Sequence, residues 1–103
     1  MEQPNPHELK KTSLAPCEHG REFWINHGAI VNNLRQLADE IDRMSWDTFK
    51  HHVGQEKDDF AAWIKDVLDN PFLANDLHSD QNINDKSQYA RTLRDHMGWL
   101  EAS

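Results

Sequence analysis

The residues best suited to chemistry in this chain are its one cysteine and several of its seven histidines. Thiolate sulfur and neutral imidazole nitrogen are preferred zinc ligands in proteins. The candidate metal ligands are Cys17, His19, His27 and either His51 or His52. Cys17-x-His19 is not a standard zinc spacing, and two adjacent histidines point about 100° apart on a helix. We therefore predict no metal and no cofactor. A small protein that senses a metal or a redox change remains the third-ranked hypothesis, below the two functions described later in this section.

His52 is expected to have a structural role. It lies on the apolar side of a predicted short helix, where an imidazole is usually hydrogen-bonded to a carboxylate or a backbone carbonyl. Asp59 or Asp58 is the expected carboxylate. We predict that His52, Asp58 and Asp59 are structural polar residues.

The sequence contains no recognisable catalytic motif. It has no glycine-rich phosphate loop, no Gly-x-Ser-x-Gly elbow and no paired acids in an obvious pocket. Cys17 beside His19 lacks an evident pocket or oxyanion hole. We predict that the protein is not an enzyme.

Two tryptophans are the best candidates for contact with a partner. Trp24 lies in a predicted hairpin, where alternation turns its ring away from the face of its apolar neighbours. Trp99 lies off the apolar stripe of the last predicted helix. Exposed indoles are favoured anchors of protein interfaces. With Asp59 and Asp66 on the acidic surface, they form the predicted partner-binding set.

The net charge of −7 is unevenly distributed along the chain. Residues 39–85 carry twelve acids and four bases, a net charge of −8, whereas the flanks carry six acids and seven bases. An acidic field repels phosphate backbones, so we predict no direct binding of nucleic acid. The same charge motivates the alternative hypothesis of an acidic decoy that inhibits a nucleic-acid-binding protein.

The remaining composition favours a small cytoplasmic protein. A chain of 103 residues fits one domain. A single cysteine excludes an internal disulfide and suits a reducing compartment. The first residues lack the apolar run of a signal peptide, and no stretch approaches the length of a membrane span.

The helix that organises the chain is predicted within residues 57–68. Its apolar residues recur at i, i+3, i+4, i+7 and i+8, which forms one stripe that must be buried. They are Phe60, Trp63, Ile64, Val67 and Leu68.

Capping residues and apolar stripes predict four further helices around this one. Helices are expected from Leu34 to Arg43, after Ser45, after Asn70-Pro71 and after Asp85. Residues 22–31 predict a hairpin in which Gly28 supplies the positive φ of a tight turn. The predicted fold is mainly α, a small bundle of four to five short helices with a short N-terminal β-hairpin.

The predicted domain organisation follows from these elements. Residues 1–20, which contain three prolines, are expected to form a flexible N-terminal arm. Residues 21–78 form the helical core domain with the hairpin. Residues 79–84 are polar and unpatterned, a predicted linker, and residues 85–103 form a C-terminal helix that packs on the core or on a partner.

The run from Phe23 to Leu77 resembles a family of small helical domains of unknown function from archaea and bacteria. The shared motifs are F-x-x-x-x-G, L-x-x-L-A, M-S-x-x-T-F-x-x-H-V, D-F-x-x-W-I-x-D-V and L-A. The resemblance implies a helical architecture, without an established activity, and marks His52, Asp59 and Trp63.

These observations together predict a small acidic, non-enzymatic protein-interaction module, such as an adaptor, a regulator or an assembly subunit. It is expected to bind a protein partner or a second copy of itself through exposed aromatic residues, because the chain has a complete core pattern, surplus aromatics and no chemical motif.

Overall fold

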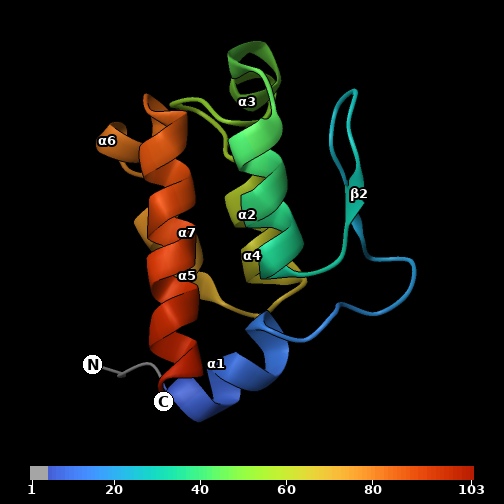
Figure 1. The fold of residues 1–103 in the computed structure, drawn as a ribbon, viewed down its shortest axis with the longest axis vertical. Helices are drawn as coiled ribbons and strands as arrows, with labels where there is room; N and C mark the ends of the chain where they lie inside the picture. Colours follow the sequence, from blue (N-terminus) through green and yellow to red (C-terminus); the bar gives the residue numbers. More distant parts are fainter. Residues whose placement is uncertain (1–4) are drawn as a thin grey trace.

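A computed structural model describes residues 5–103, which form seven helices and one two-stranded antiparallel hairpin (Figure 1). The mainly α fold with an N-terminal hairpin is confirmed, and two of the helices described were not predicted. The elements are α1 (Pro6–Ser13), β1 (Phe23–Trp24), β2 (Ile30–Val31), α2 (Leu34–Arg43), α3 (Trp46–His52), α4 (Asp59–Asp66), α5 (Pro71–Leu77), α6 (Asp80–Ile83) and α7 (Lys86–Glu101).

The predicted helices begin at side chains that cap them. Each cap accepts a hydrogen bond from the N–H three residues later, which satisfies a donor that the helix itself leaves free. Pro71 occupies the first turn of α5, where its missing N–H costs nothing. The caps of α2, α3, α4, α5 and α7 are Asn33, Ser45, Asp58, Asn70 and Asp85.

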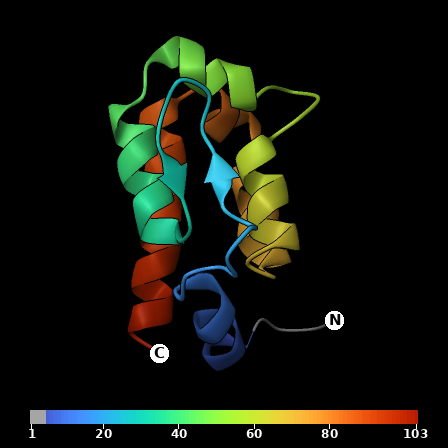
Figure 2. The same ribbon diagram turned by 90° about the vertical axis from the view of Figure 1, so that its right-hand side faces the viewer.

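The helices stack in two layers, with the hairpin as a third. α2 packs on α7 and α4 packs on α5, while α5 also contacts α7. The hairpin lies over the face formed by α2 and α4, as Figure 2 shows. The predicted stripe of α4 is buried in this core, because Phe60, Ile64 and Leu68 are fully inaccessible and Trp63 is nearly so.

The hairpin turn differs from its prediction. Positive φ occurs at His27, with φ of 57°, and Gly28 is not the left-handed residue. Gly28 is instead required by packing, since a Cβ there would lie 2.9 Å from the Ile25 Cγ2 atom. Ile25 is buried beside the turn, so Gly28 is needed for its close approach to this side chain and not for its backbone conformation.

The predicted flexible arm contains helix α1, so that prediction needs correction. Asn5 caps α1 and accepts from the N–H groups of His7 and Glu8, with Pro6 in the first turn. Leu9 and Ser13 are buried, and α1 packs on α7. Residues 1–4 of the predicted arm lie outside the described residues.

The predicted linker contains the short helix α6, which is a second correction. Ser79 caps it, and Asn82 and Ile83 are buried. The Asn82 side chain donates to the Asp76 carbonyl at 3.2 Å and lies 3.4 Å from the Thr92 hydroxyl of α7. These contacts attach the segment to the core, and α7 then packs along α2 and α5.

Candidate functional site

The outer face of the hairpin carries an exposed apolar pair. Trp24 and Ile30 are register partners on β1 and β2, with 73% and 49% of their surfaces exposed. Directly opposed residues in an antiparallel pair have Cβ atoms about 4.5–5.5 Å apart. The two side chains therefore form one apolar patch, which we call the hairpin face.

The opposite face of the hairpin packs on an aromatic cluster. The Phe23 ring lies 5.1 Å from the ring of Phe60, 6.0 Å from that of Trp63 and 5.2 Å from that of His52, between centroids. Val31, its register partner, is buried. Because strand side chains alternate between faces, the inward packing of partly buried Phe23 and buried Val31 turns the hairpin face outward.

His52 and Asp59 hold the hairpin through its backbone. The Asn26 N–H donates to His52 Nε2 at 3.0 Å, so the neutral ring carries its proton on Nδ1. Nδ1 donates to Asp59 Oδ2, also at 3.0 Å, and the His52 ring is buried. Of the two carboxylates predicted to bind His52, Asp59 makes the contact. It is 38% exposed and also lies 3.5 Å from Lys57 Nζ.

Two more hydrogen bonds attach the base of the hairpin. The Trp63 Nε1–H donates to the Arg21 carbonyl at 2.8 Å, and the Cys17 N–H donates to the Asn32 carbonyl at 2.7 Å. Trp63 was marked by its sequence motif, and its indole connects α4 to the segment before β1. Hydrogen bonds thus hold the hairpin both at its turn, through His52, and at its base, through Trp63 and Cys17.

Asp58 joins α4 to α7. Its carboxylate accepts from the Ala61 N–H at 2.9 Å and from the Tyr89 hydroxyl at 2.7 Å and 2.9 Å. Burial raises its pKa, and these hydrogen bonds oppose that rise. Burial and the neighbouring Asp58 carboxylate raise the pKa of Tyr89 well above its ordinary value. Asp58 is therefore a structural residue of the core.

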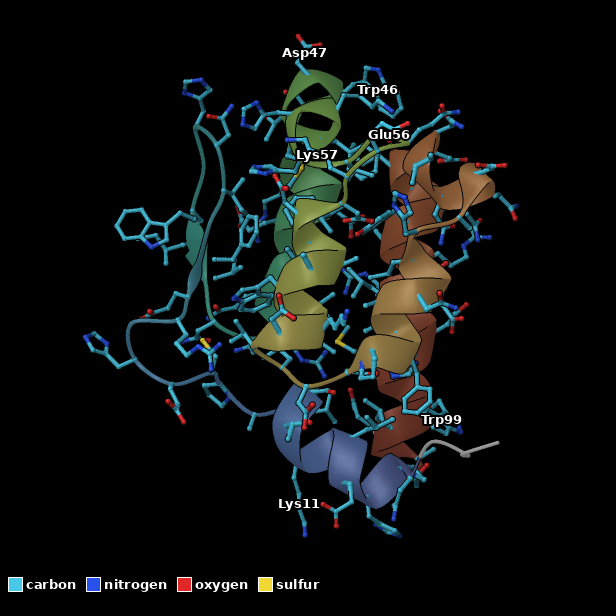
Figure 3. The ribbon with its side chains drawn as sticks, turned by 180° about the vertical axis from the view of Figure 1, so that it is seen from behind. Lys11, Trp46, Asp47, Glu56, Lys57 and Trp99 are labelled. Atoms are coloured by element: carbon cyan, nitrogen blue, oxygen red, sulfur yellow. The ribbon has the colours of Figure 1, made fainter. Side chains whose placement is uncertain are left out.

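A groove of about 510 Å³ runs between α4 and α5 beside Asp58. His78 lines one end, with Nδ1 3.5 Å from Asp58 Oδ2 and Nε2 3.2 Å from the Gln55 carbonyl. Glu56 and Lys57 lie at the same end, on the loop before α4 (Figure 3). Both ring nitrogens of His78 therefore face acceptor oxygens of the chain itself.

The structure does not bring together the residues of the predicted partner-binding set. Trp99, 41% exposed, stacks on His96 with centroids 5.2 Å apart, and Figure 3 shows it on the side of the molecule opposite the hairpin. Asp66 is exposed on α4, while Asp59 is engaged by His52. Trp24 is the member that lies on the hairpin face.

Sequence reasoning missed Ile30, the second member of the hairpin face. The signal that points to it is register: in a hairpin whose turn is centred on residue 27, residues 24 and 30 are opposed and share a face. Trp46 is also exposed, at the start of α3, where Lys50 Nζ lies 5.4 Å from its ring.

The candidate metal ligands named from the sequence are not brought together in the structure. Within residues 5–103, no three His, Cys, Asp or Glu side chains gather closely enough to hold a metal ion. Burial is the main cause that raises the pKa of Cys17, which reduces the thiolate needed for coordination or attack. His19 lies 3.5 Å from Glu22, and His27 and His51 are exposed.

Comparisons with known proteins add no assignment: the chain matches no family model, no curated protein and no solved structure. The resemblance over Phe23–Leu77 therefore stays a prediction. In the part of the chain that the structure describes, no helix has both the length and the apolar character needed to cross a membrane.

Proposed function

We propose that this chain is a small acidic, non-enzymatic protein-interaction module that binds a protein partner through the hairpin face. The observation that carries the proposal is the exposed cross-strand pair of Trp24 and Ile30. Tryptophan is enriched among the residues that dominate interface energies. Its position on an anchored hairpin supports the proposal, because a preordered contact loses little conformational entropy on binding.

The surroundings of the hairpin face indicate which force supplies the affinity. A groove of about 230 Å³ is lined on one side by Ile30 and Val31 of β2 and on the other by Asp39, Glu40 and Arg43 of α2, so the rim beside the hairpin face is polar and of mixed charge. Glu40 and Arg43 are paired with each other at 2.7 Å. We therefore expect an apolar contact at the centre, with a partner that presents a complementary apolar surface and a polar rim.

The first test compares variants as bait in pull-downs from the native lysate at low and high salt. The wild-type protein is expected to retain a partner at high salt, because apolar contacts are not screened as charge pairs are. Trp24→Ala should lose that partner, whereas Trp46→Ala, which truncates an exposed tryptophan of α3, should keep it. Both variants should retain wild-type helicity.

Retention of the same partners by Trp24→Ala would contradict the proposal. Surface truncations usually change the free energy of unfolding by no more than about 0.5 kcal/mol. Urea denaturation of both variants therefore separates a lost contact from a lost fold.

A second copy of the chain is one form that the partner can take. Sedimentation analysis over a range of protein concentrations tests this form directly. A dimer that forms in the wild type and not in Trp24→Ala would place the hairpin face at the interface between two copies. If the wild type stays monomeric at all concentrations, the partner is a different protein.

The acidic decoy ranks below this proposal because several carboxylates are neutralised within the chain. Arg94 lies 2.9 Å from Asp39 and 2.6 Å from Asp42, and Arg43 pairs with Glu40. A decoy requires free carboxylates along one face. Partners that dissociate at high salt and consist mainly of nucleic-acid-binding proteins would favour the decoy instead.

A further inference from the structure

Three helices meet at a small polar cluster on the side of the molecule away from the hairpin face. Ser13 at the end of α1 and Asn70 at the start of α5 are fully buried, and His96 of α7 is half-buried. The Asn70 Nδ2 atom lies 2.9 Å from Ser13 Oγ and 3.0 Å from His96 Nε2. The Asn70 amide thus connects the three helices.

The hydrogen bonds of this cluster determine the state of the histidine. Asn70 Oδ1 accepts from the Leu73 N–H at 3.0 Å as the cap of α5, so the amide nitrogen must face the other two groups. Its two hydrogens go to Ser13 Oγ and His96 Nε2. His96 Nε2 is therefore an acceptor, and the ring is neutral with its proton on Nδ1.

Protonation of His96 is incompatible with this arrangement. An imidazolium directs an N–H at Nε2 toward the Asn70 amide, which also presents an N–H. Rotation of the amide by 180° does not help, because its nitrogen would then face the Leu73 N–H and the helix cap would be lost. A buried donor without an acceptor is costly, so protonation of the ring breaks its contact with Asn70 and weakens the cluster.

We propose that His96 is a proton-sensitive latch that keeps α1 docked on α5 and α7 in its neutral form and releases α1 when the ring is protonated. Outside this cluster, Leu9 is the one buried large apolar side chain of α1, and its C-cap Leu14 is partly buried against the core. Lys10 Nζ lies 3.5 Å from the Ser103 carbonyl. The latch is independent of the hairpin face.

The charges around His96 favour the neutral ring in the folded protein. Burial lowers the pKa of His96, and the Asp76 carboxylate of α5 opposes this effect without overcoming it. On α7, Asp95 precedes the ring and is exposed.

The charged groups of α1 are engaged at its surface. Glu8 pairs with Lys11 at 3.8 Å, and Lys10 reaches the end of α7. The helix therefore presents the uncharged Ser13 hydroxyl to the cluster.

Because the pKa of His96 is lowered in the folded state, acid should weaken the latch. The neutral ring is favoured in the folded state, so its contribution is complete above the ordinary histidine pKa of 6.5. It is lost as the pH falls from 6.5 through the lowered pKa of the folded state. The latch is thus closed at neutral pH and opens in mild acid.

Release of α1 would uncover a defined surface. α1 crosses the C-terminal end of α7, as Figures 1 and 2 show. Met97 and Leu100 are buried on this part of α7, beside the exposed Trp99. An open latch would join these side chains into one apolar surface.

Amide hydrogen exchange of the intact chain at pH 7.5 and pH 5.0, corrected for intrinsic rates, tests the proposal. The protection of α1 should fall about tenfold in the wild type at pH 5.0, because an exposed imidazole gains its proton below its ordinary pKa. His96→Gln should show no such fall, because a glutamine oxygen accepts from Asn70 and does not titrate. The matched control is His51→Gln, which removes an exposed histidine of α3 and should behave as the wild type.

Two results would overturn the latch. One is an equal fall in α1 protection in the wild type and in His96→Gln, or no fall in either. The other is a simultaneous loss of protection in α2, α4 and α7, since that indicates global unfolding. If His96→Gln does not fold, Ser13→Ala serves instead: it should leave α1 unprotected at both pH values while the other helices stay protected.

Discussion

The Tyr89 hydroxyl and the Asp58 carboxylate form a buried contact between α7 and α4. Tyr89→Phe removes the donor and leaves a desolvated carboxylate with the Ala61 N–H as its close partner. We expect the free energy of unfolding to fall by about 1–3 kcal/mol, the usual cost of an unsatisfied buried polar group. Urea denaturation at pH 7 measures it.

A double-mutant cycle with Asp58→Asn provides the control for this prediction. Tyr89→Phe should lower the free energy of unfolding by less when residue 58 is asparagine, because a neutral amide depends less than a carboxylate on the hydroxyl donor. An equal decrease in the free energy of unfolding in both backgrounds would show that the Tyr89 hydroxyl does not stabilise the fold through Asp58.

The pH dependence of stability that we expect from Asp58 is opposite to that from His96: Asp58 stabilises the folded state as the pH falls. Burial raises its pKa above the ordinary value of 3.8, so the folded state holds this proton more tightly than the unfolded state. Its contribution to stability is complete below pH 3.8 and is lost as the pH rises through the raised value. The wild type should therefore gain stability relative to Asp58→Asn as the pH falls from 7 to 4.

This comparison belongs in a His78→Gln background, because the His78 ring lies 3.5 Å from the Asp58 carboxylate and contacts it directly. Unfolding curves at pH 7, 5.5 and 4 give the required differences. A constant difference across this range would contradict the raised pKa.

Some hydrogen-bond partners of buried side chains can be predicted from the sequence, and others cannot. A carboxylate partner for a histidine on an apolar helix face follows from chemistry, because a buried imidazole needs one. The second partner of His52, the Asn26 N–H, depends on how the hairpin docks. The same limit applies to His96, whose acceptor role is defined by Asn70 and Ser13 from two other helices.

The docking of the hairpin depends on His52 more than on its two short strands. His52→Ala removes the acceptor of the Asn26 N–H and the ring beside Phe23. We expect the Asn26 amide to lose its hydrogen-exchange protection and the hairpin to become more mobile, while α7 amides stay protected. His51→Ala, one position earlier and exposed, is the matched control. Unchanged Asn26 protection in His52→Ala would refute this role.

The helices that sequence identified combine a cap with an apolar stripe, and those that it missed lack the stripe. α2 begins after Asn33 and buries Leu34, Leu37, Ala38 and Ile41, a full helical period. α1 buries one large apolar residue, Leu9, and α6 is a single turn with Ile83. Their capping signals were present in the sequence, because Asn5-Pro6 repeats the pattern of Asn70-Pro71.

The relative placement of the elements was beyond the sequence. Period and alternation show which side of an element faces the core, and they do not say which exposed residues become neighbours. Trp24 and Trp99 are both exposed, yet they lie on opposite sides of the molecule. Their separation arises because the hairpin covers α2 and α4, whereas α7 lies in the layer behind.

Ion pairs across α2 and α7 connect the two halves of the bundle at its surface. Arg94 of α7 contacts Asp39 and Asp42 of α2, and it partly offsets the acidic charge there. Arg94→Ala should be less stable than the wild type at low salt. The difference should shrink as salt is raised, since exposed pairs are screened. Thermal unfolding at two ionic strengths checks this, and a difference independent of salt would rule out a charge effect.

The hydrogen bond from the Trp63 indole to the Arg21 carbonyl also gives the chain an optical reporter. Trp63 is buried against Phe23, whereas the other three tryptophans are exposed. A variant in which Trp24, Trp46 and Trp99 are replaced by phenylalanine would emit from Trp63 alone. Its fluorescence should be blue-shifted while the hairpin is docked and should shift to longer wavelength when water reaches the indole. Opening of the hairpin can thus be timed by stopped-flow mixing without an attached dye.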